Sequence, residues 1–167
     1  MSFDIVDAKV LAGEATDALK SSGVKTTRRV ITFETAAADA AGDIKALFRV
    51  GAHEIPVEGW LISDAIAGAS DLDVGLYRDN QVVVDKDALA DGLDPSAGIA
   101  FASKLDILAA LGVEERGVLK FFEIANDVAT GDVIGVLPND SYWVAITLNS
   151  EVTAAGTITV SLTTVGR

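Results

Sequence analysis

A Ser–His–Asp arrangement in this chain would have only one possible base, the single histidine His53, because histidine is the side chain that ordinarily titrates near neutral pH. His53 lies in the segment Gly51-Ala52-His53-Glu54, between two predicted strands. Nucleophilic catalysis would need a nucleophile and an orienting acid beside it, and the sequence has no G-x-S-x-G nucleophile elbow. The chain also contains no cysteine, which excludes a thiolate nucleophile, a disulfide and a cysteine-ligated metal. We therefore interpret His53 as a solvated loop residue and assign no catalytic residue.

A run of aspartates between residues 71 and 94 is the second candidate, because Ca²⁺ prefers carboxylate oxygens. The spacing does not match an EF-hand loop, which needs ligands at fixed offsets, a central glycine and a terminal glutamate. Asp71 and Asp73 share the solvent face of one predicted strand. We favour a solvated acidic face with capping residues and expect no metal site. The aspartates of the run are Asp71, Asp73, Asp79, Asp85, Asp87, Asp91 and Asp94.

Other kinds of site leave weaker signals. Glycoside cleavage by a pair of carboxylates remains an open alternative for a β-rich domain, but no Asp or Glu pair stands out from the others. The glycines form neither G-x-G-x-x-G nor a P-loop, so the sequence indicates no nucleotide site and no other cofactor. Four aromatic residues offer a sugar-stacking platform, although their positions within predicted strands favour packing instead. These residues are Trp60, Tyr77, Tyr142 and Trp143.

Composition narrows the class of protein. The 167 residues are about the length of one domain. Acidic residues outnumber basic ones by 25 to 13, which gives a net charge of −12. Nucleic acid and anionic membranes are therefore not expected as partners, because both need clustered Lys and Arg. No run approaches the roughly 18 apolar residues of a membrane span, and the acidic start of the chain is unlike a secretory signal. We expect a soluble protein made in the cytoplasm.

Alternation of apolar and polar residues predicts the clearest strands. The segments 142–148 and 158–162 alternate cleanly, and the short link between them predicts a hairpin. The segment 71–77 directs Leu72, Val74 and Leu76 to one face. In the segment 43–50 the alternation predicts a shared face for Ile44, Ala46, Phe48 and Val50.

Capping signals predict two short helical segments among further strands. The segment 85–91 begins at Asp85 as N-cap and ends before Gly92, and the segment 103–111 has near capping-box spacing. Pro56 and Gly59 interrupt a strand at 55–62 and predict an edge or bulged position there. The remaining predicted strands are 29–35, 81–84, 118–124 and 132–137.

Many short strands with little helix predict an all-β fold, an antiparallel β-sandwich or a jelly-roll-like barrel with one or two short helices and an N-terminal arm. We divide the chain into an arm, residues 1–28, and a β-sandwich domain, residues 29–167. The apolar residues of the arm are too sparse to build a core and are predicted to bind a partner. They are Phe3, Ile5, Val6, Val10 and Leu11.

Five segments of the body resemble a group of small structural proteins of tailed bacteriophages, found among head genes. The likeness covers roughly residues 30–165 and leaves the arm outside. The segments are 36–44 (AAADAAGDI), 72–77 (LDVGLY), 84–92 (VDKDALADG), 142–147 (YWVAIT) and 154–160 (AAGTITV).

The resemblance implies a virion structural protein, a capsid decoration (cement) protein that binds the outside of the assembled head and stabilises it. It implies the major capsid protein as partner, a homo-oligomer such as a trimer, a location on the capsid surface after synthesis in the host cytoplasm, and no enzymatic activity. Three alternatives stay open: a tail or neck structural protein, a carbohydrate-binding β-sandwich module and a hydrolase.

Overall fold

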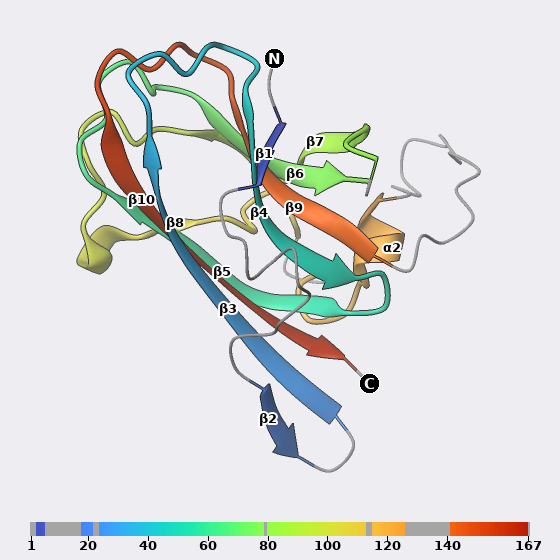
Figure 1. The fold of residues 1–167 in the computed structure, drawn as a ribbon. Helices are drawn as coiled ribbons and strands as arrows, with labels where there is room; N and C mark the ends of the chain where they lie inside the picture. The colour runs from blue at the N-terminus through green and yellow to red at the C-terminus, as the bar shows by residue number, and fades with distance from the viewer. Residues whose placement is uncertain are drawn as a thin grey trace.

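The fold consists of two five-stranded sheets packed face to face, as Figure 1 shows for this computed structural model. The structure describes residues 3–5, 18–21, 24–78, 80–112, 115–125 and 141–166. The first sheet has the order β1-β4-β9-β6-β7, and the second has the order β2-β3-β10-β5-β8. The sheets do not close into a barrel, so the predicted all-β sandwich is confirmed and the barrel alternative is not formed.

Nearly all strand pairs are antiparallel, and the exception among the described residues is β1 beside β4. The first sheet contains β1 (Phe3–Ile5), β4 (Ile44–Gly51), β9 (Ser141–Leu148), β6 (Leu72–Tyr77) and β7 (Val83–Leu93). The second contains β2 (Ala18–Ser21), β3 (Val24–Thr35), β10 (Gly156–Gly166), β5 (Ile55–Ser63) and β8 (Leu105–Asp106). The helical elements described are the short 3-10 helix η1 (Phe101–Ser103) and the helix α2 (Phe121–Ala125), and no described helix is long and apolar enough to cross a membrane.

The core lies between the sheets and follows the predicted alternation in three strands. Leu72, Val74 and Leu76 of β6 are fully buried there, as expected. Every second residue of β9, in the same sheet, joins this core: Tyr142, Val144, Ile146 and Leu148. From the opposite sheet β10 contributes Ile158, Val160 and Leu162. Each such aliphatic side chain contributes roughly 1.5–3 kcal/mol on burial, which makes this face the main source of stability.

A β-bulge in β4 changes the predicted face of that strand. The pairing of β4 with β9 shifts register between Ala46 and Phe48, so the side-chain alternation changes phase there. Phe48 and Val50 consequently point into the core, whereas Ile44 and Ala46 join a smaller buried cluster with Tyr77, Trp143 and Ala145 on the other face of the sheet. The single shared face predicted for segment 43–50 is therefore wrong.

The predicted hairpin of segments 142–148 and 158–162 is also wrong. β9 pairs with β4 and β6 in the first sheet, and β10 pairs with β3 and β5 in the second. The link between β9 and β10 thus crosses from one layer to the other. The predicted irregularity in β5 is confirmed, because its pairing with β10 shifts register between Thr163 and Thr164, opposite Glu58 and Pro56.

The helical predictions fail in the middle of the chain. Segment 85–91 lies within β7, where Leu89 and Ala90 reach the core. Segment 103–111 holds the end of η1, the two-residue β8 and a turn, and segment 118–124, predicted as a strand, overlaps α2. Strand pairing with β6 overrides the helical preference of the alanines and leucines in β7. The predicted strand 132–137 lies outside the described residues.

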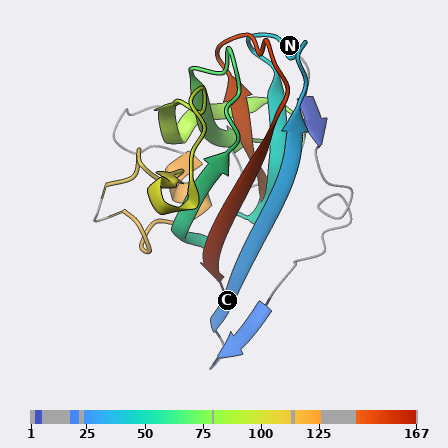
Figure 2. The ribbon, with the colours of Figure 1, turned by 90° about the vertical axis from the view of Figure 1, so that its left-hand side faces the viewer.

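Two strands come from the predicted arm. β1 runs parallel to β4, with Phe3 opposite Ile44, and β2 pairs antiparallel with the first residues of β3. β3 begins at Val24, so residues 24–28 already belong to a long strand of the second sheet. Figures 1 and 2 both show β2 at the far end of β3, beyond the rest of the body. The division of the chain at residue 28 stays a prediction.

Candidate functional site

His53 lies in the turn that joins β4 to β5 and is exposed, as the sequence predicts. In the part of the chain that the structure describes, no three or more His, Asp or Glu side chains gather in a way that could hold a metal ion. The candidate sites that remain are the buried carboxylate of Asp73, the part-buried carboxylate of Glu54 and one surface patch.

Asp73 departs from the predicted solvated acidic face, because its side chain is fully buried. Lys86 Nζ donates to one carboxylate oxygen at 2.8 Å, and the backbone N–H of Gly92 donates to the other at 3.2 Å. Burial alone would raise the pKa of Asp73, but hydrogen bonds from Asn149, Lys86 and Gly92 outweigh it and lower the pKa. The aspartate is therefore ionised and committed to holding β7 against β6.

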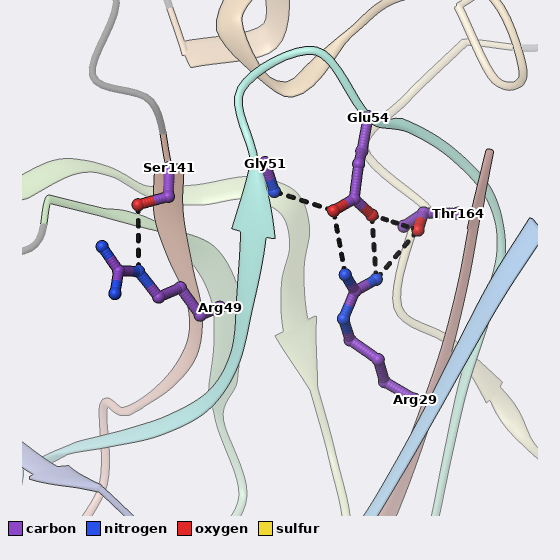
Figure 3. Close-up of polar contacts among 6 residues, drawn as sticks. All are labelled: Arg29, Arg49, Gly51, Glu54, Ser141 and Thr164. Carbon is purple, nitrogen blue, oxygen red and sulfur yellow. Dashed lines mark hydrogen bonds and ion pairs between the residues drawn. The ribbon is translucent and has the colours of Figure 1, made fainter. Parts of the chain in front are cut away.

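Glu54 is the centre of a second polar cluster, which Figure 3 draws. The Arg29 guanidinium donates to both carboxylate oxygens of Glu54, each at 2.9 Å. The Gly51 N–H donates to Oε1 at 2.9 Å, and the Thr164 hydroxyl donates to Oε2 while accepting from Arg29 at 2.8 Å. The cluster joins β3, β10 and the β4–β5 turn.

The same turn is held from its other side by α2. The backbone N–H groups of Phe121 and Phe122 donate to the carbonyl oxygens of Glu54 and Ala52. A further contact in Figure 3 ties β4 to β9, where Arg49 Nε donates to Ser141 Oγ at 3.0 Å. These bonds fix the end of the sandwich at which β4 of the first sheet passes into β5 of the second.

The electrostatics of Glu54 match a structural role. Burial alone would raise its pKa, but the hydrogen bonds and charge of Arg29, with Thr164 and Gly51, lower the pKa overall. A general acid needs the opposite shift, a raised pKa near the working pH. Glu54 was missed from the sequence because its partners Arg29 and Thr164 lie 25 and 110 residues away along the chain.

The four aromatic residues considered as a sugar platform are all buried, which confirms the packing interpretation. The hydroxyls of Tyr77 and Thr147 hydrogen-bond to each other. Burial raises the pKa of Tyr77 and of Tyr142. Trp60 and Trp143 keep 8% and 5% of their surface exposed, so neither presents a free ring face.

One apolar and cationic surface lies on the outer face of the second sheet, and we call it the Phe101 patch. It consists of Phe101, Trp60, Lys104 and Arg28. Phe101, in η1, is 64% exposed and meets the Trp60 ring edge-on, with centroids 5.6 Å apart and planes at 88°. Lys104 Nζ lies 5.5 Å from both ring centroids, and the Arg28 guanidinium lies 6.0 Å from that of Trp60.

The strand register places this patch in a continuous row across the sheet. Val30 of β3 lies opposite Ser161 of β10, which in turn lies opposite Trp60 of β5. Val30 is exposed, and Arg28 of β3 donates through Nε to Ser161 Oγ of the neighbouring β10 at 3.3 Å. The row therefore presents apolar and cationic groups on one surface.

The predicted partner-binding residues of the arm are only partly placed. Phe3 and Ile5 lie in β1, at an edge of the first sheet. Val6, Val10 and Leu11 lie outside the described residues. The binding role of these five residues stays a prediction.

Comparison with known proteins identifies solved structures that resemble this chain in fold. No family model matches the sequence, and no curated protein matches it. A chain of the solved structure "Capsid of Ralstonia phage GP4" shares the fold with a TM-score of 0.61 and 19% sequence identity, over 100% of this chain and 97% of that one. A chain of "Cyanophage Pam1 capsid asymmetric unit" has a TM-score of 0.47 and 13% identity, over 92% and 96%. The likeness to the first chain extends over both whole chains, so the two share one architecture.

Proposed function

We propose that this chain is a structural protein of a tailed-bacteriophage virion, and more specifically a capsid decoration (cement) protein that binds the outside of the assembled head and stabilises it. The observation that carries the proposal is the fold shared over its whole length with a chain of the Ralstonia phage GP4 capsid. The family resemblance of segments such as 72–77 and 142–147 supports the same class.

The polar interior supports a protein that holds position rather than one that turns over a substrate. Hydrogen bonds from Arg29 hold the part-buried Glu54 ionised, and hydrogen bonds from Lys86 and Gly92 do the same for the buried Asp73. Among the described residues no three or more His, Asp or Glu side chains form a group that could hold a metal ion. The proposal therefore assigns binding to the surface and no catalytic step to the chain.

The proposed partner is the major capsid protein, and the proposed assembly is a homo-oligomer, a trimer on the symmetric shell. The location is the capsid surface, reached after synthesis in the host cytoplasm. The arm contributes to attachment through its sparse apolar residues. Deleting residues 2–17 removes β1 while leaving β2 and β3 in the chain, so we expect a folded body with weakened particle binding. Full occupancy by the truncated protein would assign attachment to the body alone.

Mass spectrometry of purified particles tests the proposal, because it measures copy number relative to the major capsid protein. A decoration protein follows the lattice of the shell and has a copy number proportional to that of the shell protein. A few copies per particle would assign the chain to the neck or tail instead. Its absence from purified particles would refute the virion role.

A carbohydrate-binding module is the second candidate, and the exposed ring of Phe101 is the observation that favours it. Stacking on a sugar usually needs a free ring face, and Trp60 beside it is covered. A glycan array that gives binding by the wild type, lost in Phe101→Ser, would support the module. Equal signals for the two proteins would remove it.

A further inference from the structure

We propose that the open edge of β3, residues 29–35, pairs with the same edge of a second copy of this chain, so that their second sheets join into one continuous sheet. We call this stretch the β3 edge. The inference goes beyond the proposed function and does not depend on it. The contact has twofold symmetry, and within the proposed assembly it would link neighbouring trimers.

The β3 edge has a strand partner on one side only. β10 pairs with β3 from Lys25 to Thr35, whereas β2 pairs with it only from Val24 to Thr27. In the part of the chain that the structure describes, no residue pairs with the other side of β3 between Arg29 and Thr35. Figures 1 and 2 both show β2 beside one end of β3 and not along its length. The stretch is therefore a template for another strand.

The other sheet edges are shorter, covered or irregular. β1 has three residues and β8 has two, and the pairing of β7 with β6 shifts register three times. The N–H groups of Ile107 and Gly117 donate to carbonyl oxygens of β5. Proteins usually blunt an exposed edge with bulges, prolines or very short strands. The β3 edge has no proline, and the pairing of β3 with β10 has no register shift, which indicates an edge that is used for pairing.

The ladder shows which backbone groups this edge offers. The Asp64 N–H donates to the Thr157 carbonyl oxygen at 2.9 Å, so Thr157 directs its backbone groups away from β3. Glu34 lies opposite Thr157, and its N–H and C=O consequently point toward the open edge. By alternation Val30 and Thr32 do the same. Backbone donors and acceptors spaced along an extended strand are matched best by another extended strand.

The two ends of the open stretch determine the register of a second copy. β2 occupies this side of β3 as far as Thr27, and β3 ends at Thr35. An antiparallel copy fits between these limits with Thr32 on the twofold axis. A copy centred on Ile31 would place its own Thr35 opposite Thr27, where Ala18 already pairs. With Thr32 on the axis, the edge-facing residues of the two copies form three hydrogen-bonded pairs and exchange about six backbone hydrogen bonds.

The side chains are compatible with this register. Thr32 meets Thr32 of the second copy, and Ile31 meets Phe33, both favourable kinds of cross-strand pair. Glu34 lies opposite Val30, so no like charges face each other directly. The net charge of −12 does not oppose the contact locally, because residues 29–35 contain one arginine and one glutamate. The edge is thus self-complementary in backbone, shape and charge.

Cysteine crosslinking tests the register directly, because the chain has no cysteine of its own. In Thr32→Cys the two introduced residues would be opposite each other, with Cα atoms about 5.5 Å apart, a separation that a disulfide spans. Val30→Cys is the matched control. Val30 is exposed on the same face of β3, but its counterpart in the second copy would lie about 13 Å away along the strand. With oxidised glutathione as oxidant, Thr32→Cys is expected to form crosslinked pairs at least about tenfold faster than Val30→Cys.

Sedimentation of the free full-length protein tests the backbone contact. Thr32→Pro removes an N–H that β10 does not use, and proline is tolerated at such edge positions. Thr32→Val is its control, because both variants lose the 2.8 Å hydrogen bond between the hydroxyls of Thr32 and Thr159. The wild type and Thr32→Val are expected to sediment at twice the mass of Thr32→Pro or more. Thermal melting checks folding, and Thr32→Lys, which places like charges at the axis, replaces Thr32→Pro if the proline variant does not fold.

The outcomes separate a second copy from other occupants. Equal crosslinking rates for Thr32→Cys and Val30→Cys, or equal masses for wild type and Thr32→Pro, would overturn the proposal. Equal masses together with weaker binding of Thr32→Pro to phage particles would assign the edge to a strand of the shell protein, which also overturns it. Because both measurements use the free protein, they stand even if the chain proves to be absent from purified particles.

Discussion

Replacing Glu54 with glutamine would leave the Arg29 guanidinium in a largely buried position without its counter-charge. Breaking a fully buried ion pair from one side costs about 3–5 kcal/mol. The Arg29 and Glu54 side chains keep 13% and 21% of their surface exposed, and the glutamine oxygen still accepts one bond. We therefore expect Glu54→Gln to lower the free energy of unfolding by about 2–3 kcal/mol. For a chain of this length that is a fall in melting temperature of about 5–10 °C.

Urea unfolding followed by tryptophan fluorescence measures this change, because both tryptophans are buried and report loss of the fold. Glu58→Gln is the control, since Glu58 belongs to an exposed ion pair, and its cost should stay within about 0.5 kcal/mol. A double-mutant cycle with Arg29→Met isolates the pair. A cost for Glu54→Gln no larger than that of the control, or a coupling energy near zero, would refute the reasoning.

The same pair predicts an acid limit of stability. The folded pKa of Glu54 lies below its ordinary value, so its contribution is fully present above about pH 4.3, the value in an unfolded chain. It is lost as the pH falls from there through the lowered pKa of the folded state. The unfolding free energy of Glu54→Gln should therefore vary less with pH in this window than that of the wild type.

Three further changes have expected outcomes. Gly75→Ala should abolish folding or lower the free energy of unfolding by more than about 3 kcal/mol, because the added Cβ would lie 2.2 Å from the Asp85 carbonyl oxygen. Gly92→Ala should lower it by only about 1–2 kcal/mol, because open space surrounds the added Cβ and only the φ of 67° is unfavourable. Thermal melting of both variants measures the difference. Asp73→Asn should lower the free energy of unfolding by about 1–3 kcal/mol in urea, because it weakens the hydrogen bond from Lys86. Because the folded pKa of Asp73 is lowered, the wild type loses stability as the pH falls below about 3.9, and the variant should lose less. An unchanged pH profile would contradict this. Adding a chelator should leave the melting temperature unchanged within about 1 °C, and a large fall would mean that the aspartates of segment 71–94 bind Ca²⁺.

Local pattern was enough to predict the strands whose side chains alternate strictly. Segments 72–76, 142–148 and 158–162 each bury every second residue in one core, so period-2 alternation identifies both the strand and its inward face. The all-β class follows from the same pattern. The exposure of His53 was equally predictable, because a turn between two strands lies at the surface.

The tertiary structure alone decided pairing, bulges and the partners of buried charges. β9 and β10 lie close in sequence but enter different sheets, because each is stabilised by strands far away along the chain. Segment 85–91 has helix-forming residues, yet pairing with β6 and burial of Leu89 outweigh that preference. The bulge between Ala46 and Phe48 reverses the face of β4, and the register with β9 that produces it is a long-range contact.

The Glu54 cluster and the Phe101 patch illustrate the same limit. From the sequence alone Glu54 is a polar residue in a turn. Its partners Arg29 and Thr164 become its neighbours only when β3 and β10 pack beside that turn. Phe101 and Trp60 are about forty residues apart, and only the packing of η1 against β5 makes them neighbours. Residue type and spacing determine which side chains prefer burial, whereas the long-range contacts that lower the free energy of one arrangement determine which of them meet.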